Sequence, residues 1–229
     1  RASGRECIAR LAAGAIARKL AGAVGIRFSG KVIELAGEPV HCQEDYERAK
    51  ARALEIGRHG DSTGGVVEII IEGLPPGLGT PVFGKLQADL AQAFLSIGGV
   101  KGLEYGLGFD VARLTGSEHN DPFGMDAEGR IITKGNRCGG LLGGISTGGP
   151  VSFRLAVKPT PTIRIPQESV NLVEGKEVMM EYQGRFDANY TPRVIPIGES
   201  MAAIVVADHL LMGGMIHPCR LGAEISNQG

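Results

Sequence analysis

The sequence predicts an α+β fold in which helices are layered on an antiparallel sheet. Helical periodicity recurs in well-separated segments, and β-branched or alternating segments lie between them. The two kinds of segment do not alternate regularly enough for a doubly wound nucleotide fold or a barrel. The chain has no internal repeat, low-complexity linker or break in composition, so we expect one domain over residues 1–229.

The beginning of the chain is predicted to contribute two helices and a strand. Residues 3–20 form a helix, with Ser3 and Glu6 at the spacing of a capping box. Residues 25–35 are typical of a strand, and residues 43–58 form a second helix with a polar outer face. The apolar positions on or near one face of the first helix are Ile8, Leu11, Ala12, Ala15 and Leu20.

The middle of the chain combines strands with a third helix. Residues 66–73 are a β-branched run that indicates a buried strand, and Pro81 is expected to start the helix. Strand-like segments follow at 100–105 and 109–114. The apolar positions that mark the third helix are Val82, Phe83, Leu86, Leu90, Phe94 and Ile97.

The last part of the chain is expected to contain turns, one clear strand and a closing helix. A hairpin turn is predicted around 125–133, and residues 150–159 alternate as a strand. Another turn is expected at Glu174–Gly175. The chain should close with a helix over about 194–212 and a short tail.

Composition and charge exclude several classes of function. The net charge of −1 provides no overall attraction to nucleic acid or to an anionic membrane. The longest apolar candidate, 201–212, is interrupted by Asp208 and His209, so we expect no membrane role. The four cysteines are scattered without metal-ligand spacing, which favours idle thiols in the cytoplasm over disulfides or a metal site.

Glycine is the unusual component of this sequence. The chain has 36 glycines without a Gly-X-Y period, gathered in the loops GDSTGG, GLPPGLGTP and GGLLGGISTGG. Glycine allows backbone to approach a ligand closely. So many glycine-rich loops between well-patterned elements indicate backbone wrapped around a bound group.

The opening stretch, RASGREC, is a candidate anion site. The start of a helix presents free N–H groups and the positive end of its dipole, and Arg1 and Arg5 lie beside it. The alternative interpretation is an ordinary helix start with two solvated arginines.

Two further segments could hold an anion. Lys158-Pro159-Thr160-Pro161-Thr162 follows a glycine-rich loop and a strand, and its charge and hydroxyls could bind phosphate. It matches neither a P-loop nor a dinucleotide fingerprint, so a proline-stiffened edge is the alternative. In GRFDANYTPR, Arg185 and Asp187 form either an anion clamp with a carboxylate beside it or a surface charge pair.

The histidines offer no clear catalytic arrangement. His59 and Asp61 lie on either side of Gly60 and could act together as acid and base. None of the five histidines has a nucleophile nearby in sequence, and a lone histidine is usually structural.

The order and spacing of these stretches resemble the chorismate synthase family over essentially the whole chain. No common fold shares this series of motifs, so the combined signal is specific. The stretches are RASGRECIARLAAGAIARKL, GDSTGG, GLPPGLGTPVFGKLQADLAQAFLSIGGVKGLEYGLGFDVARLTGSEHND, GGLLGGISTGGP, KPTPT and GRFDANYTPRVIPIGESMAAIVVADHLL.

The resemblance implies a fold and a reaction. The fold would be the β-α-β sandwich of that family. The reaction would be the 1,4-anti elimination of phosphate from 5-enolpyruvylshikimate 3-phosphate, which gives chorismate in the last step of the shikimate pathway. Reduced FMN is required without net redox change, and NADPH is a possible source of its electrons. Family members are cytoplasmic homotetramers.

The resemblance also implies roles for individual residues. Arg5 would face the anionic groups of the substrate, and Asp187 would assist proton handling near the flavin ring. The flavin contacts carried over position by position are Arg1, Ala2, Ser3, Gly98, Gly99, Gly143, Lys158, Pro159, Thr160, Pro161, Thr162 and Arg185.

The chain departs from the family pattern in ways that affect the expected activity. Phe186 and Ala188 stand where the family usually has His and Pro, and Cys7 stands where it has Thr. The family's Gly-Glu-Ser-His-Gly-like segment and its second catalytic His precede the part matched here. We therefore expect an N-terminally truncated chain that is inactive alone.

The alternative function is that of a non-catalytic flavin- or anion-binding protein that acts with a partner chain. A kinase lacks support, because the sequence contains no nucleotide-binding loop.

Overall fold

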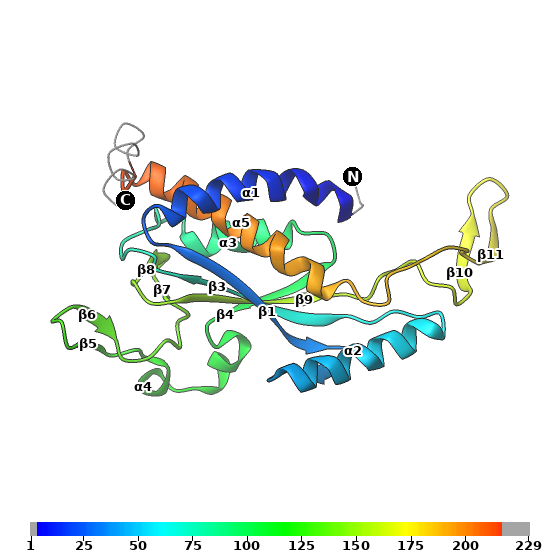
Figure 1. Cartoon of the computed structure of the whole chain (residues 1–229), viewed down its shortest axis with the longest axis horizontal. Helices are drawn as coiled ribbons and strands as arrows, with labels where there is room; N and C mark the ends of the chain where they lie inside the picture. The colour runs from blue at the N-terminus through cyan, green and yellow to red at the C-terminus, as the bar shows by residue number, and fades with distance from the viewer. Residues whose placement is uncertain (1–3, 217–229) are drawn as a thin grey trace.

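A five-stranded antiparallel sheet forms the centre of the computed structural model, which describes residues 4–216 (Figure 1). The strand order is β2-β1-β3-β9-β4, so strands distant in sequence are neighbours in the sheet. The strands are β1 (Arg27–Leu35), β2 (Glu38–Pro39), β3 (Gly65–Glu72), β9 (Val151–Val157) and β4 (Val100–Tyr105).

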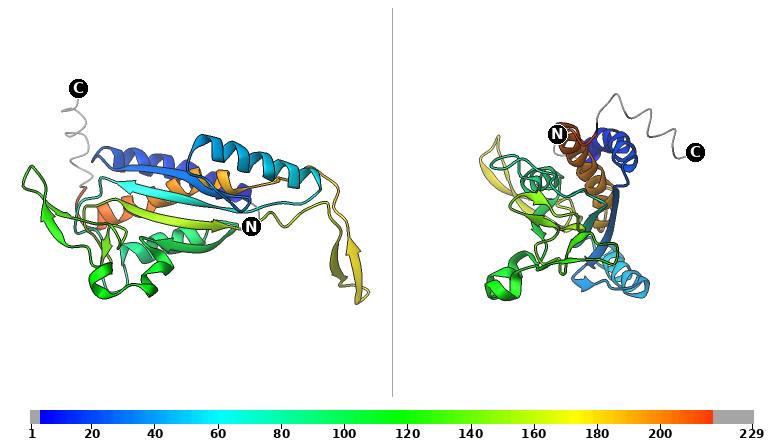
Figure 2. Two further views of the ribbon diagram at one scale, coloured as in Figure 1. Left: turned by 90° about the horizontal axis from the view of Figure 1, so that it is seen from below. Right: turned by 90° about the vertical axis from the view of Figure 1, so that its left-hand side faces the viewer.

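Helices α1 (Cys7–Gly22), α3 (Leu86–Leu95) and α5 (Thr191–Met212) lie together on one side of this sheet (Figure 1). Helix α2 (Gln43–Arg58) packs beside β1 and β2, apart from the other three helices (Figure 2). This arrangement confirms the predicted α+β fold with helices layered on antiparallel sheet.

Several short elements lie outside the central sheet and the long helices. They include the 3-10 turns η1 (Gly4–Glu6) and η2 (Gly108–Arg113) and the one-turn helix α4 (Gly116–His119). Hairpin β10–β11 projects from the body as an arm in both views (Figures 1 and 2). The hairpin strands are β5 (Phe123–Met125), β6 (Ile131–Thr133), β7 (Leu141–Leu142), β8 (Ile145–Ser146), β10 (Gln167–Asn171) and β11 (Lys176–Met180).

The core lies between the sheet and the three helices. Alternate residues of a strand point to the same face, so Val67, Ile69 and Ile71 of β3 are all buried toward the helices. The ring centroids of Phe153 on β9 and Phe94 on α3 are 5.1 Å apart, so these rings pack the sheet against α3. Each such fully buried side chain stabilises the fold by about 1.5–3 kcal/mol.

The opposite face of the sheet carries a row of alternating charges. In register across the strands stand Lys31, Glu68, Arg154 and Glu104, from β1, β3, β9 and β4 respectively. The Lys31–Glu68 ion pair measures 3.0 Å and the Arg154–Glu104 pair 2.7 Å. Cross-strand opposite charges favour this register, while the apolar residues on the other face keep the helices on their side.

Helix α5 is the central helix of the core. By length and composition alone, this helix could cross a bilayer. The sequence analysis considered only residues 201–212, whereas the helix begins at Thr191. It buries small and branched residues such as Ala203 and Val206 against α1 and the sheet. Its apolar character is therefore explained by its position inside the protein.

Two predicted elements were wrong. Residues 109–114 were expected to be a strand, but they form η2, because the positive φ angles of Gly106 and Gly108 turn the chain away from the sheet. The third helix begins at Leu86 rather than Pro81. Residues 80–84 form a closed turn, and Phe83 is 94% exposed rather than part of the helix.

The buried face of α1 also differs from the expected one. Ile8 is 69% exposed, whereas Cys7, Gly14 and Ala21 are buried. The reason is close helix packing, because a Cβ atom at Gly14 would lie 2.2 Å from the Cβ atom of Ser200 on α5. Small residues at this crossing bring the two backbones together and set the rotation of α1.

We predict that Gly14→Ala destabilises the protein by about 1–3 kcal/mol, because the added methyl group overpacks the α1–α5 contact. Thermal melting would measure the change. Gly22→Ala in the last turn of the same helix is the matched control, since nothing lies within 4 Å of its Cβ position. Equal melting temperatures for Gly14→Ala and the unmodified chain would contradict this account of the packing.

Candidate functional site

Two of the predicted flavin segments meet where β4 begins and β9 ends. The backbone N–H of Lys158 donates to the carbonyl of Gly99 at 2.9 Å. Gly99 adopts a φ of 94°, a conformation that favours glycine and places its carbonyl toward β9. The antiparallel pairing of β4 with β9 therefore brings Gly98–Gly99 beside the Lys158–Thr162 segment.

Segment 185–190, which contains the predicted residues Arg185 and Asp187, joins the same edge through the GDSTGG loop by way of Ala188 and Asn189. The N–H of Thr63 donates to the carbonyl of Ala188 at 2.8 Å. The side-chain amide of Asn189 donates to the carbonyls of Thr63 and Gly64 at 3.0 and 2.9 Å. A Cβ atom at Gly64 would lie 2.3 Å from the carbonyl oxygen of Val157, so only glycine fits between these strands.

The Lys158–Thr162 segment is fixed by the same loop. The hydroxyl of Ser62 donates to the carbonyl of Thr160 at 2.7 Å. The hydroxyl of Thr160 is itself buried, and it has no hydrogen-bond partner among residues 4–216. Buried hydroxyls are normally paired, so an unpaired one at this edge is a candidate contact for a bound group.

Tyr190 lies at the centre of this cluster, and sequence analysis did not identify it. A Cβ atom at Gly4 would lie 3.0 Å from its phenol oxygen, and one at Gly99 would lie 3.7 Å from its ring. Burial raises the pKa of Tyr190, and the Cys7 thiol raises it further. Gly4 and Gly99, which leave room for this side chain, were the only features of the sequence that could have pointed to Tyr190. Both are far from Tyr190 in sequence.

The charged candidates lie in segments that lead to this edge. Asp187 forms an ion pair with Arg193 at 2.6 Å, and both side chains are largely exposed. Arg185 is exposed in the same segment, and Arg5 is exposed in η1 at the start of α1. The predicted carboxylate is therefore oriented by Arg193. Arg1, Ala2 and Ser3, and with them the predicted Ser3 cap, lie outside the described residues.

Gly143 is not part of this cluster. It lies in the β7–β8 turn, near the end of the sheet where β9 begins, with a φ of 60°. There it lines a cavity of about 480 Å³ together with Tyr105, Phe109 and His119. Within the described part of the chain, the structure places Gly143 apart from the other predicted flavin contacts.

The polar groups around this cavity have structural roles. Burial disfavours the charged form of Asp121, but the N–H groups of Cys138 and Arg137 donate to its carboxylate and hold its pKa below the usual value. Burial raises the pKa of the Cys138 thiol, and Asp121 raises it further. A thiol with a raised pKa is a poor nucleophile at neutral pH.

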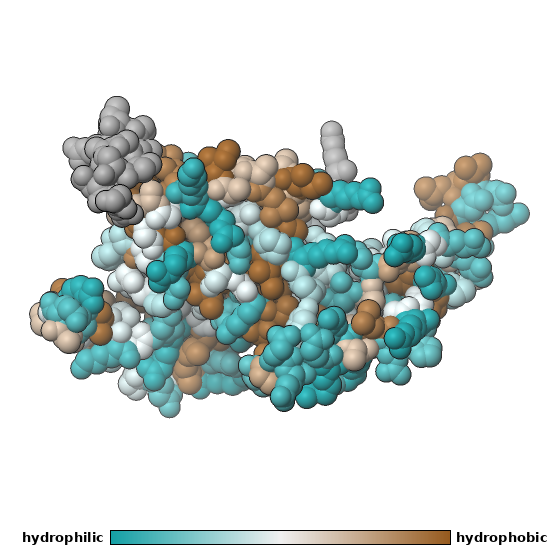
Figure 3. Space-filling view, viewed as in Figure 1, coloured by the Kyte–Doolittle hydropathy of each residue, from teal (hydrophilic) through white to brown (hydrophobic). Residues whose placement is uncertain are grey.

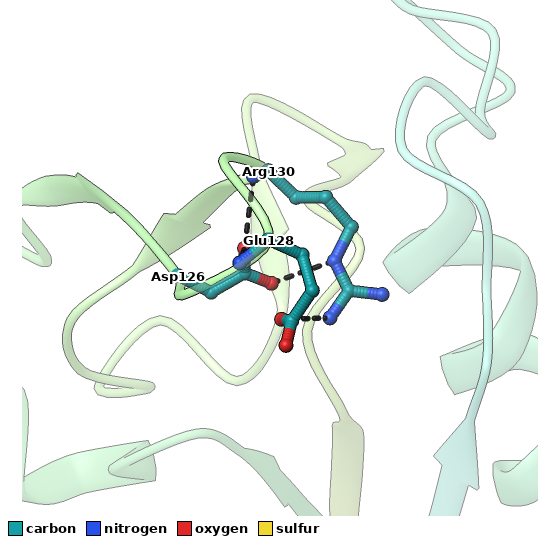
Figure 4. Close-up of polar contacts among 3 residues, drawn as sticks. All are labelled: Asp126, Glu128 and Arg130. Carbon is teal, nitrogen blue, oxygen red and sulfur yellow. Dashed lines mark hydrogen bonds and ion pairs between the residues drawn. The ribbon is translucent and has the colours of Figure 1, made fainter.

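Other acidic side chains, and His209, are paired within the protein. In the predicted turn around 125–133, Arg130 binds Asp126 at 2.6 Å and Glu128 at 2.9 Å (Figure 4). The Nε2 atom of buried His209 lies 2.8 Å from Asp89, which links α5 to α3. Across residues 4–216, no three His, Cys, Asp or Glu side chains gather as metal ligands would.

Comparison with known proteins identifies the family. The family model described as chorismate synthase matches residues 1–211. The chain belongs to the chorismate synthase family.

Relatives support this membership and show how much of their length is shared. A chorismate synthase of Methanothermobacter thermautotrophicus is 44% identical over 98% of this chain and 65% of its own length. One from Acetivibrio thermocellus is 46% identical over 92% of this chain and 59% of its own length. The chain thus spans less than two thirds of the curated relatives that it matches.

A solved structure shows the same fold. A crystal structure of chorismate synthase superposes with a TM-score of 0.78 at 28% identity. The superposition covers 99% of this chain and 69% of the chain in the crystal structure. The layered α+β arrangement is therefore that of the chorismate synthase family.

We predict that Asn189→Ala loosens the edge of the sheet, because its amide joins the GDSTGG loop to the start of α5. Hydrogen exchange should become faster at the backbone amide of Thr63, which donates to Ala188 beside this contact. Asn171→Ala is the matched control, since that side chain also accepts backbone N–H bonds but lies in the remote β10–β11 arm. Unchanged protection at Thr63 in Asn189→Ala would contradict the role given to Asn189.

Proposed function

We propose that this chain carries the flavin and substrate-anion cradle of a chorismate synthase. The reaction would be the 1,4-anti elimination of phosphate from 5-enolpyruvylshikimate 3-phosphate to give chorismate, with reduced FMN. The observation that carries the proposal is the meeting of Gly98–Gly99, Lys158–Thr162 and segment 185–190 at one edge of the sheet. Beyond family membership, this convergence is what supports a ligand site there.

The residues at this edge fit a phosphorylated, planar group. Gly98 is exposed and nothing lies within 4 Å of its Cβ position, and the buried hydroxyl of Thr160 has no partner among the described residues. The ammonium group of Lys158 is positively charged and can donate hydrogen bonds to a phosphate oxygen. Glycine backbone, a hydroxyl and a cation are the groups that hold flavin phosphates and ring carbonyls.

The mechanism requires a positive site for the departing phosphate and a controlled proton. Reduced FMN, when bound, supplies electron density to the allylic system of the substrate. Arg5 would place positive charge near the anionic groups of the substrate, where it stabilises the charge that develops on the leaving phosphate. Asp187, oriented by Arg193, would receive or pass on a proton at its carboxylate.

Further properties follow from the same proposal. We propose that the chain alone is inactive, because the resemblance to the family implies acid–base histidines that would lie outside the matched part. We also propose a cytoplasmic homotetramer, with NADPH as a source of electrons for the flavin. Exposed apolar residues support association, including Ile16 on α1 and Leu172 and Val173 at the tip of the arm. Brown apolar patches over α1 and the arm are visible in Figure 3.

We predict that Lys158→Met weakens binding of FMN by about tenfold, because a charge-assisted hydrogen bond to phosphate is lost. Titration of FMN fluorescence would measure it. Lys176→Met on β11 is the matched control, since it removes the same charge from the projecting arm. Equal affinities of the two variants would contradict the placement of the phosphate at Lys158.

We predict no chorismate formation by the isolated 229-residue chain with reduced FMN and 5-enolpyruvylshikimate 3-phosphate. Anaerobic assay of chorismate by its absorbance would test this. Addition, as a separate chain, of the part of the Methanothermobacter relative that this chain does not cover should restore turnover if the cradle is functional. Robust turnover by the isolated chain would refute its dependence on the family's histidines. Binding of FMN without restored turnover would favour the non-catalytic alternative.

A further inference from the structure

The phenol of Tyr190 is a buried polar group with no established use. Its oxygen is inaccessible to solvent and has no hydrogen-bond partner among residues 4–216. Leaving a buried donor unpaired costs about 1–3 kcal/mol, so such groups are uncommon unless something else pairs with them. Phenylalanine would fill the same space without this cost.

The surroundings of the phenol consist of the predicted ligand-binding segments. The oxygen faces Gly4, where a Cβ atom would lie 3.0 Å away, and the ring edge faces Gly99. Asp187 precedes it by three residues and acts on its pKa. The hydroxyl is thus directed at Gly4, in the segment that leads into α1, while the ring packs against Gly99.

The phenol stays protonated at neutral pH. Burial raises the pKa of Tyr190, and the nearby Cys7, Asp187 and Glu6 groups raise it, while Arg193 opposes them. A neutral phenol is a hydrogen-bond donor, and a donor next to Gly4 in the predicted anion site suits an acceptor atom of an anionic ligand. The unpaired hydroxyl of Thr160 lies on the neighbouring segment, so two donors serve the same edge.

We propose that the Tyr190 hydroxyl donates a hydrogen bond to the bound flavin or to its phosphate, which makes Tyr190 a ligand-contacting residue of this site. The inference rests on the proposed function, because it requires the flavin at this edge. Gly4 and Tyr190 act as a pair, since the absence of a side chain at Gly4 leaves room for the phenol oxygen.

The test compares Tyr190→Phe with the unmodified chain in two measurements. In the ligand-free protein, Tyr190→Phe should leave the melting temperature equal or higher, because an unpaired buried hydroxyl is removed. Binding of FMN, followed by fluorescence titration, should become about tenfold weaker. Tyr182→Phe is the matched control, since its exposed hydroxyl contacts only the sulfur of Met180 at 3.9 Å within the described chain.

A double-mutant cycle tests the pairing with Gly4. Gly4→Ala should weaken FMN binding in the unmodified chain, because the added methyl group displaces the phenol oxygen. In the Tyr190→Phe background the same change should have a smaller effect. Additive effects would contradict the pairing of these two residues.

The outcomes separate this inference from the proposed function. If the unmodified chain binds FMN and Tyr190→Phe binds it equally well, the hydroxyl contact is refuted while the flavin site stands. A clear loss of stability in ligand-free Tyr190→Phe would show that the hydroxyl has a structural partner, and would also refute it. An unmodified chain that binds neither oxidised nor reduced FMN would overturn the proposed function, and this inference with it.

Discussion

The side chain of Asn189 forms the contact on which the arrangement of the site depends. Its amide donates to the backbone of Thr63 and Gly64, and its oxygen accepts the N–H of Thr191 at 2.8 Å. One side chain thus caps the start of α5 and fixes the loop that precedes β3. Since Gly64 in turn lies against the carbonyl of Val157, the end of β9 is placed by the same contact. The position of Lys158 and Thr160 follows from that placement.

The rest of the molecule keeps this edge rigid. The apolar face of the sheet is closed by α5, whose central position is set by small residues such as Gly14 and Ser200 at the crossing with α1. The other face is held in register by the charge row that includes Glu68 and Arg154. A one-residue slip of β9 would expose Phe153 and reverse the side chains near Lys158. Core packing and charge pairing therefore support the same geometry at the edge.

Sequence analysis predicted those parts that depend on local patterns. The β-branched run of β3, the helix at α2 and the turn at Asp126–Arg130 were all found, because their signals are local. Residues 109–114 were expected to be a strand, but the glycine turns at Gly106 and Gly108 lead the chain away from the sheet. The surroundings of His209 and Tyr190 could not be predicted, because His209 is 120 residues from Asp89 and Tyr190 lies against Gly4 and Gly99, which are distant in sequence.

The central claim is that the ligand binds at the edge formed by Gly98–Gly99, Lys158–Thr162 and segment 185–190. Backbone amide chemical shifts of the labelled chain during titration with FMN test it most directly. The account predicts that shifts concentrate in these three segments and at Thr63, while the arm residues 167–180 stay unchanged. Shifts confined to the separate cavity around Phe109, His119 and Gly143 would contradict the account.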